Sequence, residues 1–330
     1  MTRNLLTLAL IYCLTLAFAS CGEKNFVNSG ATWGTTYNIS YTAPRDLGDS
    51  IIAVMARIDS ELSMFNPSST VSQINSNTKL EATPMFVDVF NLSVQISRLS
   101  GGMFDPTVGP LTDLWGFGRK QQPDSLIPTA TEIDNALDAV GIADCRIDNR
   151  RVVKKSPATI FDFSSVAKGY GVDQVAEMLR RNGASSYLVE IGGEISASAA
   201  RPDGRLWHIQ IDAPIMGDDI HSRMYLIELS QRSVATSGNY RKFRQTADGI
   251  VGHTLDPRTG RPVVSSTLSA TVIATDCATA DALATACMAM NADSALTMIE
   301  ALPDVEALIA LAQSDTLTIL KTSAFPSPLK

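Results

Sequence analysis

The sequence predicts an α+β fold in which mixed or antiparallel β-sheets pack against helices. Stretches with helical spacing of apolar residues alternate with shorter stretches of strand-like alternation. Some strand-like stretches follow one another directly, which favours antiparallel pairing over a purely parallel sheet. The chain has 330 residues, of which 45% are hydrophobic, and this is enough to bury a substantial core.

The N-terminal segment has the pattern of a bacterial lipoprotein signal. Arg3 precedes an apolar run, Leu5–Ala19, that is too short to span a bilayer comfortably. We expect residues 1–20 to be removed, Cys21 to carry lipid and residues 21–30 to act as a polar tether. This predicts an exported, membrane-anchored lipoprotein that faces the periplasm. An ordinary cleaved signal with an incidental cysteine is the alternative.

Residues 31–330 are expected to form one folded unit. The spacing of Ile51, Met55 and Ile58 predicts a helix over 49–64. Two more helices are expected over 86–99 and 129–141, the second stopped by a glycine. Strands are expected in 32–41, 145–163, 186–191, 206–212, 223–229 and 268–275.

The segment 158–193 predicts a strand, a helix and a second strand. Ile160–Phe163 is expected to be a buried strand with Asp162 near its end, and Ser164 or Ser165 is expected to cap the helix. A helix N-terminus attracts phosphate groups, and Lys168 near this one strengthens the attraction. A capped helix with a solvent-facing lysine explains the segment equally well.

Residues 274–290 predict a further helix that carries two oxygen ligands. Asp281 and Thr285 are four residues apart, so they share one helical face. A carboxylate and a hydroxyl suit Mg²⁺ and are poor ligands for zinc. The alternative is an aspartate that stabilises the helix dipole and a threonine that bonds back to its own helix.

The glycine- and proline-rich segment 100–118 carries Phe104, Asp105, Trp115 and Phe117. Aromatic rings with adjacent glycines can surround a planar ligand. A long structural loop with its own small apolar core has the same composition.

The turn "HTLDPRTG" at 253–260 places His253, Asp256 and Arg258 together. His208 is expected to face out of its strand and His221 to lie on the surface. We therefore expect His253 to be the histidine that transfers a proton, with Asp256 as its orienting group or as a rival base. Taken alone, the stretch also satisfies the pattern of an ordinary type I turn.

The formal net charge of −7 argues against a nucleic-acid-binding surface. Outside the signal and Cys21, the cysteines are Cys145, Cys277 and Cys287. Their odd number and their spacing predict neither a disulfide framework nor a zinc site.

Five stretches, in order along the chain, resemble the FAD:protein FMN transferase family, whose members are also called ApbE-like lipoproteins. They are "LSMFNPSSTVSQIN", "GGMFDPTVGPLTDLWGFG", "DFSSVAKGYGVDQVAEML", "SVATSGNYRKF…HTLDPRTGRPV" and "ADALATACMAM". The resemblance implies an ApbE-like (T-fold-like) flavin transferase catalytic domain over 31–330.

The resemblance also implies an activity. Members of the family bind FAD and, with Mg²⁺, transfer its FMN part to a Ser or Thr hydroxyl of a partner protein, and AMP leaves. Their partners are flavin-accepting subunits of membrane redox complexes of the sodium-pumping NADH:quinone oxidoreductase or Rnf type. An FAD pyrophosphatase that gives FMN and AMP is the nearest alternative. A non-catalytic flavin-binding lipoprotein is another, although it needs neither a base nor a metal.

The resemblance assigns residues as well. It implies metal ligation by Ser165, Asp281 and Thr285, with Ser165 acting through its hydroxyl or its carbonyl. It implies flavin-nucleotide contacts by Trp33, Phe65, Met103, Phe104, Asp105, Asp162, Lys168 and Leu255. Phe65 stands where tyrosine is common and Trp33 where methionine is frequent. Splitting a pyrophosphate needs charge neutralisation, which Lys168 can provide, and a hydroxyl nucleophile needs a nearby base, for which His253 is expected.

Overall fold

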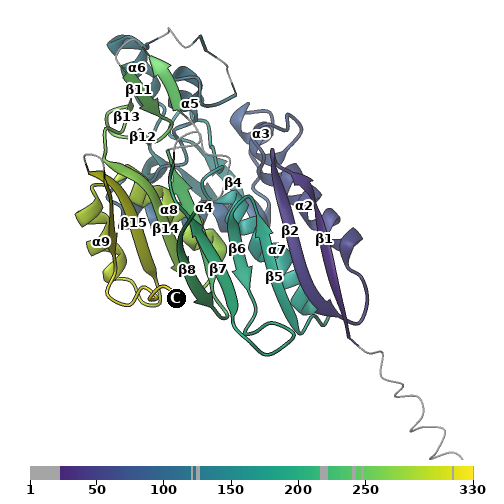
Figure 1. Cartoon of the computed structure of the whole chain (residues 1–330). Helices are drawn as coiled ribbons and strands as arrows, with labels where there is room; N and C mark the ends of the chain where they lie inside the picture. The colour runs from purple at the N-terminus through teal and green to yellow at the C-terminus, as the bar shows by residue number, and fades with distance from the viewer. Residues whose placement is uncertain are drawn as a thin grey trace, which may run out of the picture.

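A large antiparallel sheet runs through the middle of the molecule (Figure 1). The computed structural model describes residues 23–119, 122–123, 127–215, 222–239, 243–246, 249–313 and 316–329. Within these residues the sheet has eight strands, in the order β1-β2-β5-β6-β9-β14-β15-β16, and every neighbouring pair is antiparallel. The strands are β1 (Lys24–Thr32), β2 (Thr35–Ala43), β5 (Ser186–Ile191), β6 (Glu194–Ala197), β9 (Ser233–Gly238), β14 (Thr267–Ala274), β15 (Glu306–Gln313) and β16 (Thr316–Lys321).

The alternation of side chains along the strands gives the sheet two apolar faces. In β14, Ala270 and Val272 point to one face and pack with helices, while Ile273 points to the other. In β15, Ile309 and Leu308 divide in the same way. Both faces must therefore be covered, and each is covered by a different kind of element.

Helices cover one face of the sheet (Figure 1). The long ones are α2 (Gly48–Leu62), α4 (Pro84–Leu99), α7 (Ala167–Arg181), α8 (Cys277–Ala289) and α9 (Ala292–Glu300). Helix α8 is buried nearly all round because it lies between the sheet and the other helices, as its alanine-rich sequence allows. This arrangement confirms the predicted α+β class with packed helices.

A hairpin covers part of the other face. Strands β7 (Trp207–Asp212) and β8 (Arg223–Leu229) pair with each other, and their inward residues Ile209 and Ile227 pack against Val234 of the large sheet. His208 alternates outward and is exposed, as the sequence predicted, whereas His221 lies outside the described residues.

A smaller group of elements lies beyond one end of the sheet (Figure 1). Its helices are α5 (Gly109–Leu114) and α6 (Ala130–Leu137), and its strand pairs are β10 (Phe243–Thr246) with β11 (Gly249–Gly252) and β12 (Leu255–Asp256) with β13 (Arg261–Pro262). Leu111, Trp115 and Ile133 form its separate apolar cluster. The helix α3 (Thr70–Asn75), the 3₁₀ turn η1 (Ile142–Asp144) and the pair β3 (Arg146–Asp148) with β4 (Arg151–Val153) join the main core instead, through Ile74, Ile142 and Val152.

The tether prediction needs a correction. Residues 24–32 form strand β1, which pairs with β2 along its whole length from Lys24 opposite Ala43 to Thr32 opposite Thr35. Polar residues occur here because β1 is an edge strand with few buried positions, so its composition looked like that of a tether. Cys21 and the rest of residues 1–22 lie outside the described residues.

Two local predictions around helix α7 are also wrong. Ile160 makes one parallel bridge to Val108, and residues 161–163 are not a strand. The helix begins at Ala167 without a side-chain cap, because its N-cap position is Val166, and the Ser164 amide donates to the Asp162 carboxylate before the helix starts. The serines therefore belong to the turn that enters the helix.

The predicted helix over 129–141 is shorter than expected. It is capped by Thr129 and Glu132 in a reciprocal capping box and ends at Leu137. Gly141, with φ of 139°, precedes the next 3₁₀ turn instead.

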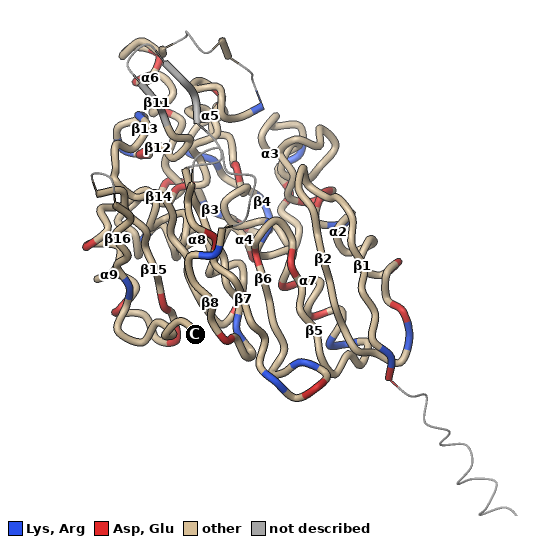
Figure 2. The backbone as a smooth tube through the Cα atoms, viewed as in Figure 1, with Lys and Arg blue, Asp and Glu red and all other residues tan. Residues whose placement is uncertain are grey.

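Charges are spread over the described surface. Figure 2 shows acidic and basic residues interspersed along the tube in the described part of the chain. No helix among the described residues has the length and apolar character needed to cross a membrane.

Candidate active site

One cavity of about 880 Å³ gathers nearly all the residues singled out from the sequence. A volume of this size is typical of a site for a large small-molecule ligand. The predicted residues that line it are Trp33, Phe65, Met103, Phe104, Asp105, Asp162, Ser165, Lys168, His253, Leu255, Asp281 and Thr285. They come from segments more than 200 residues apart, so the fold brings them together.

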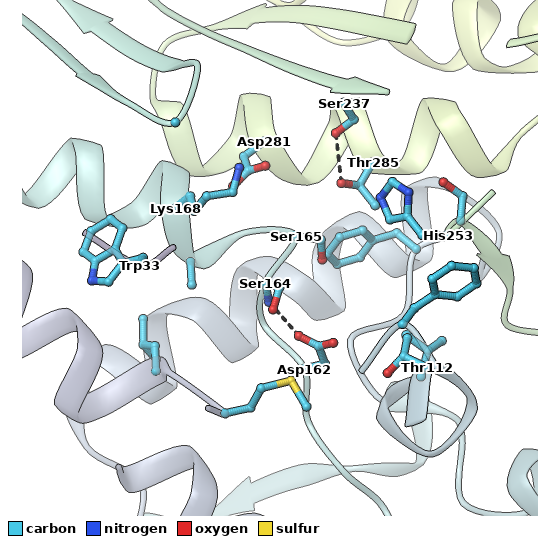
Figure 3. A pocket seen from close by; sticks show the side chains of 18 of the residues that line it. Trp33, Thr112, Asp162, Ser164, Ser165, Lys168, Ser237, His253, Asp281 and Thr285 are labelled. Atoms are coloured by element: carbon cyan, nitrogen blue, oxygen red, sulfur yellow. Dashed lines mark hydrogen bonds between the residues drawn. The ribbon is translucent and has the colours of Figure 1, made fainter. Parts of the chain in front are cut away.

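One wall of the cavity is built where helices α7 and α8 cross (Figure 3). A Cβ atom at Gly169 would overlap the carbonyl group of Cys277, so the close crossing requires glycine at this position. The Gly169 amide donates to Oδ2 of Asp281 at 3.0 Å. The same crossing therefore sets the position of the Asp281 carboxylate.

The carboxylate of Asp173 fastens the same two helices. It accepts hydrogen bonds from the amides of Cys277 and Ala278, at 2.8 and 2.9 Å, where α8 begins. A carboxylate at a helix N-terminus satisfies otherwise unpaired amides and favours the dipole. Lys168 and Asp281 therefore sit on a rigid support.

Lys168 forms an ion pair with a buried carboxylate in this wall. Its Nζ lies 2.5 Å from Oε1 of Glu194, whose side chain is 3% exposed. Burial alone would lower the pKa of Lys168, but the carboxylates of Glu194 and Asp281 raise it well above the ordinary lysine value. The lysine is therefore a fixed positive charge at the cavity wall.

Burial shifts the pKa values of the two carboxyl groups beside Lys168 upward, whereas it shifts the pKa of the lysine downward. Burial raises the pKa of Glu194 and the pKa of Asp281, while the ammonium of Lys168 lowers both. Two carboxyl groups thus interact with a single ammonium group at this wall. An additional positive charge bound there would be stabilised by the carboxylate that the ammonium does not neutralise.

The donor set on α8 fits a hard cation. Asp281 and Thr285 both line the cavity from the same helix, one turn apart (Figure 3). The Thr285 hydroxyl is 3.2 Å from the Ser237 hydroxyl, which holds it in place, and Ser165 lines the same cavity. Carboxylate and hydroxyl oxygens are ligands for Mg²⁺. Among the described residues, no group of three or more His, Cys, Asp or Glu side chains is placed to hold a metal ion, so a site here depends on hydroxyl oxygens beside Asp281.

Aromatic and apolar side chains line other parts of the cavity. Trp33 has a left-handed backbone with φ of 49°, and its indole Nε1 donates to the Met55 carbonyl at 3.3 Å. Its ring packs where a side chain at Gly171 would stand. Phe65 is 64% exposed and Phe104 is 2% exposed, so Phe65 offers the larger free ring face to a ligand.

The two predicted aspartate contacts differ in surroundings. Asp105 is held from inside the protein, because its carboxylate accepts bonds from Thr107 and from the Ile142 amide. Burial raises the pKa of Asp105, although these bonds partly oppose the rise. Asp162 shapes the entry to α7 through the Ser164 amide.

The 253–260 turn forms part of the cavity wall through His253, Thr254, Leu255 and Pro257. It is anchored by the Trp115 indole, which donates to the Gly260 carbonyl at 2.8 Å. The His253 ring packs edge-on against Phe117, with ring centroids 6.4 Å apart. The turn and the 100–118 segment are thus one structural unit at the cavity.

Asp256 is engaged by the arginine two residues further along the turn. Its carboxylate is absent from the residues that line the cavity and binds Arg258 through Nε at 3.0 Å and Nη2 at 2.9 Å. Burial alone would raise its pKa, but the bonds from Arg258 lower the pKa below the ordinary value. A carboxylate so engaged is a weak base, so this geometry argues against a catalytic role for Asp256.

Comparison with known proteins decides the family. Residues 33–309 match the family described as the ApbE family. The chain belongs to the ApbE family.

Individual relatives agree with this assignment to the ApbE family. The chain is 36% identical over 309 residues to a protein of Vibrio cholerae serotype O1 named FAD:protein FMN transferase, and the match covers 91% of each chain. A protein of the same name from Haemophilus influenzae is 32% identical, with 90% of each chain covered. Among solved structures, the flavin transferase ApbE from Vibrio cholerae superposes with a TM-score of 0.82 at 33% identity, covering 92% of this chain and 99% of that one.

The sequence did not single out every residue of this ApbE-family site. Glu194 and Ser237 line the cavity and bind Lys168 and Thr285, respectively. Glu194 follows Gly192-Gly193 at a strand end, which is a recognisable position for a functional carboxylate. Its partner lies 26 residues away on another element, so the pairing itself has no local signal.

Proposed function

We propose that this chain is an FAD:protein FMN transferase, in which the FMN part of FAD moves to a Ser or Thr hydroxyl of a partner protein and AMP leaves. The observation that carries the proposal is the single cavity that Lys168, Asp281, Thr285 and His253 line together. A phosphate-binding cation, hard oxygen ligands and a proton acceptor are the groups that phosphoryl transfer to a hydroxyl uses. The names of the relatives agree with this chemistry.

Lys168 positions the pyrophosphate in this proposal. Its ammonium is fixed at the wall and remains charged, so it offsets negative charge that develops on the phosphate oxygens. The rings of Trp33 and Phe65 offer apolar surface for the flavin and the adenine.

His253 accepts the proton of the incoming hydroxyl. A new bond forms between the acceptor oxygen and the FMN phosphorus, while the bond from that phosphorus to the AMP oxygen breaks. The hydroxyl proton passes to His253, and AMP leaves with the bridging oxygen. The Phe117 ring and the anchored turn fix the imidazole in place for this step.

Asp281, Thr285 and Ser165 would hold Mg²⁺, because their oxygens fit its preference and all three residues line the cavity. When bound, the ion supplies positive charge that offsets charge on the pyrophosphate.

The location and the partners complete the proposal. Cys21 would carry lipid and hold the domain at the membrane on its periplasmic side, near flavin-accepting subunits of sodium-pumping NADH:quinone oxidoreductase or Rnf-type complexes. We expect Cys21→Ser to lose fatty-acid labelling and to be released from membranes. Equal labelling and retention in the variant would contradict lipid anchoring.

The decisive experiment offers purified protein FAD, Mg²⁺ and a candidate acceptor subunit, and follows a covalent fluorescent band together with AMP. We expect one AMP released for each flavin attached, and no band when the acceptor Ser or Thr is replaced by Ala. Release of FMN and AMP in equal amounts with no band on any acceptor would point to an FAD pyrophosphatase instead. FAD binding without AMP release would point to a binding protein.

A further inference from the structure

The cavity wall contains a carboxylate that the reaction described above does not use. Glu194 begins strand β6 and reaches Lys168 on helix α7, with 2.5 Å between Oε1 and Nζ. Its second oxygen, Oε2, is buried, and among the described residues no hydrogen-bond partner reaches it. A buried carboxylate with one free oxygen is unfavourable, so its presence calls for a role.

Glu194 and Asp281 both face the same ammonium. Asp281 also acts on Lys168 through its charge, yet its Oδ2 is bound by the Gly169 amide, and the ion pair of Lys168 is with Glu194. An ammonium that contacts a buried carboxylate is held by that charge, since removing one partner would leave the other uncompensated. The ammonium of Lys168 is thereby paired with Oε1 of Glu194, and the Asp281 carboxylate is left for a second cation.

We infer that Glu194 is a positioning residue that holds Lys168 away from Asp281 and so keeps the Asp281 carboxylate available to a divalent cation. The inference rests on the proposed function, because it assumes that Asp281 binds the ion. It assigns Glu194 an action through Lys168 and no contact with the ion.

The formal charges of the three groups support separate roles for Glu194 and Asp281. Lys168, Glu194 and Asp281 together carry a formal charge of −1 when all three are ionised, which favours a divalent cation at the remaining oxygens. Without Glu194 the ammonium and Asp281 would neutralise each other, and a divalent ion would have to displace a buried ion pair.

The test measures Mn²⁺ binding to the protein without FAD, by the loss of the electron paramagnetic resonance signal of free Mn²⁺. We expect Glu194→Gln to bind Mn²⁺ at least tenfold more weakly than the wild type, because Lys168 turns to Asp281. Glu190→Gln, on the neighbouring strand and outside the cavity lining, removes the same charge and should change the affinity less than twofold.

The double variant Lys168→Met, Glu194→Gln gives the sharper result. It removes the ammonium and its partner together, so Asp281 is free again and the formal charge of the group is unchanged. We expect Mn²⁺ affinity within threefold of the wild type. A double variant as weak as Glu194→Gln alone would mean that Glu194 contacts the ion directly, which overturns the inference. Wild-type affinity in a folded Glu194→Gln protein overturns it as well.

Asp281→Ala separates this inference from the proposed function. If the wild type binds Mn²⁺ and Asp281→Ala does not, the metal site stands and the Glu194 variants decide the inference. If both bind equally, the ion is not held by Asp281, so the metal part of the proposed function fails together with the inference that rests on it.

Discussion

The two sides of the cavity are built in different ways. The α7–α8 wall consists of two long helices that cross at Gly169, and it holds the half-buried Lys168 beside the buried carboxylates of Asp281 and of Glu194 on β6. The 253–260 turn rests instead on a small apolar cluster, and its ion pair between Asp256 and Arg258 is largely exposed on the arginine side.

This difference corresponds to two proposed tasks, neutralisation of phosphate charge and contact with the acceptor protein. Groups that neutralise charge act most strongly where water is excluded, so they lie in the rigid wall. In the proposed function His253 meets a protein acceptor, which requires a reachable position, and His253 lies in a turn. Substitutions in the wall should therefore affect stability and ligand binding together, while those in the turn should affect turnover alone.

The largest effect is expected from Asp281→Ala. Loss of the buried carboxylate removes the proposed metal ligand and leaves Lys168 with Glu194 only, so FMN transfer should fall by roughly 10³-fold or more. Transfer is measured as covalent flavin fluorescence at saturating Mg²⁺. Asp276→Ala is the matched control, because Asp276 caps the same helix outside the cavity lining. Transfer near the wild-type rate in Asp281→Ala would remove the metal assignment.

His253→Ala tests the turn as a catalytic element. We expect FAD to bind almost normally while transfer falls by roughly 10²-fold or more, the scale of a lost general base. FAD binding is followed by flavin fluorescence and transfer by the covalent band. His208→Ala on the exposed hairpin is the control and should be unaffected. If FAD binding is lost instead, the turn holds the ligand and does not accept the proton.

Gly169→Ala tests the rigidity of the wall. The new methyl group meets the backbone of Cys277, which cannot move without shifting α8, so unfolding free energy should fall by about 1–3 kcal/mol. Gly171→Ala meets only the Trp33 ring, a side chain that can move, so the loss should be smaller. Urea denaturation of both variants measures the difference. Equal losses of unfolding free energy in the two variants would show that the α7–α8 crossing is no more closely packed than the contact between Gly171 and Trp33.

Asp173 gives the wall a pH dependence. Burial raises its pKa to about 7, although the Cys277 and Ala278 amides oppose the rise. The folded state therefore holds a proton that the unfolded state has released, and unfolding free energy should fall as pH rises from about 4 to about 7.

The comparison of wild type with Asp173→Asn isolates the contribution of Asp173 to the pH dependence of the unfolding free energy. Asparagine does not titrate, so the variant should lose less stability over the same pH range, with a difference in slope of up to about 1.4 kcal/mol per pH unit. Urea denaturation at several pH values measures both slopes. Parallel curves for the two proteins would mean that Asp173 stays ionised in the fold.

The wall was more predictable from sequence than the turn. The spacing of Asp281 and Thr285 placed them on one helical face, and the structure places both at the cavity. Lys168 near a helix start was also recognisable. Glu194 was not, because its role depends on a pairing across two elements that no local pattern records.

Two errors in the predicted secondary structure have a common origin. Residues 21–30 looked like a tether because the edge strand that begins at Lys24 has few buried positions, and 160–163 looked like a strand because its apolar residues are buried. In both segments the contacts with other parts of the chain determined the secondary structure, and the local composition did not. Asp256 was grouped with His253 because the two are close in the sequence, and in the structure its carboxylate binds Arg258.

Asp256→Asn should have the smallest effect and tests that last point. The Arg258 side chain is 59% exposed, so the ion pair should contribute less than about 1 kcal/mol. Because Asp256 lies outside the cavity lining, we expect transfer within about threefold of the wild type and an unchanged pH profile. Arg258→Ala is the companion variant, since it frees the carboxylate without removing it. If Asp256→Asn matches the loss of His253→Ala and their double variant is no worse than either, the two residues act as a unit. The aspartate would then orient the histidine in the complex with the acceptor, and the turn would work as two coupled groups.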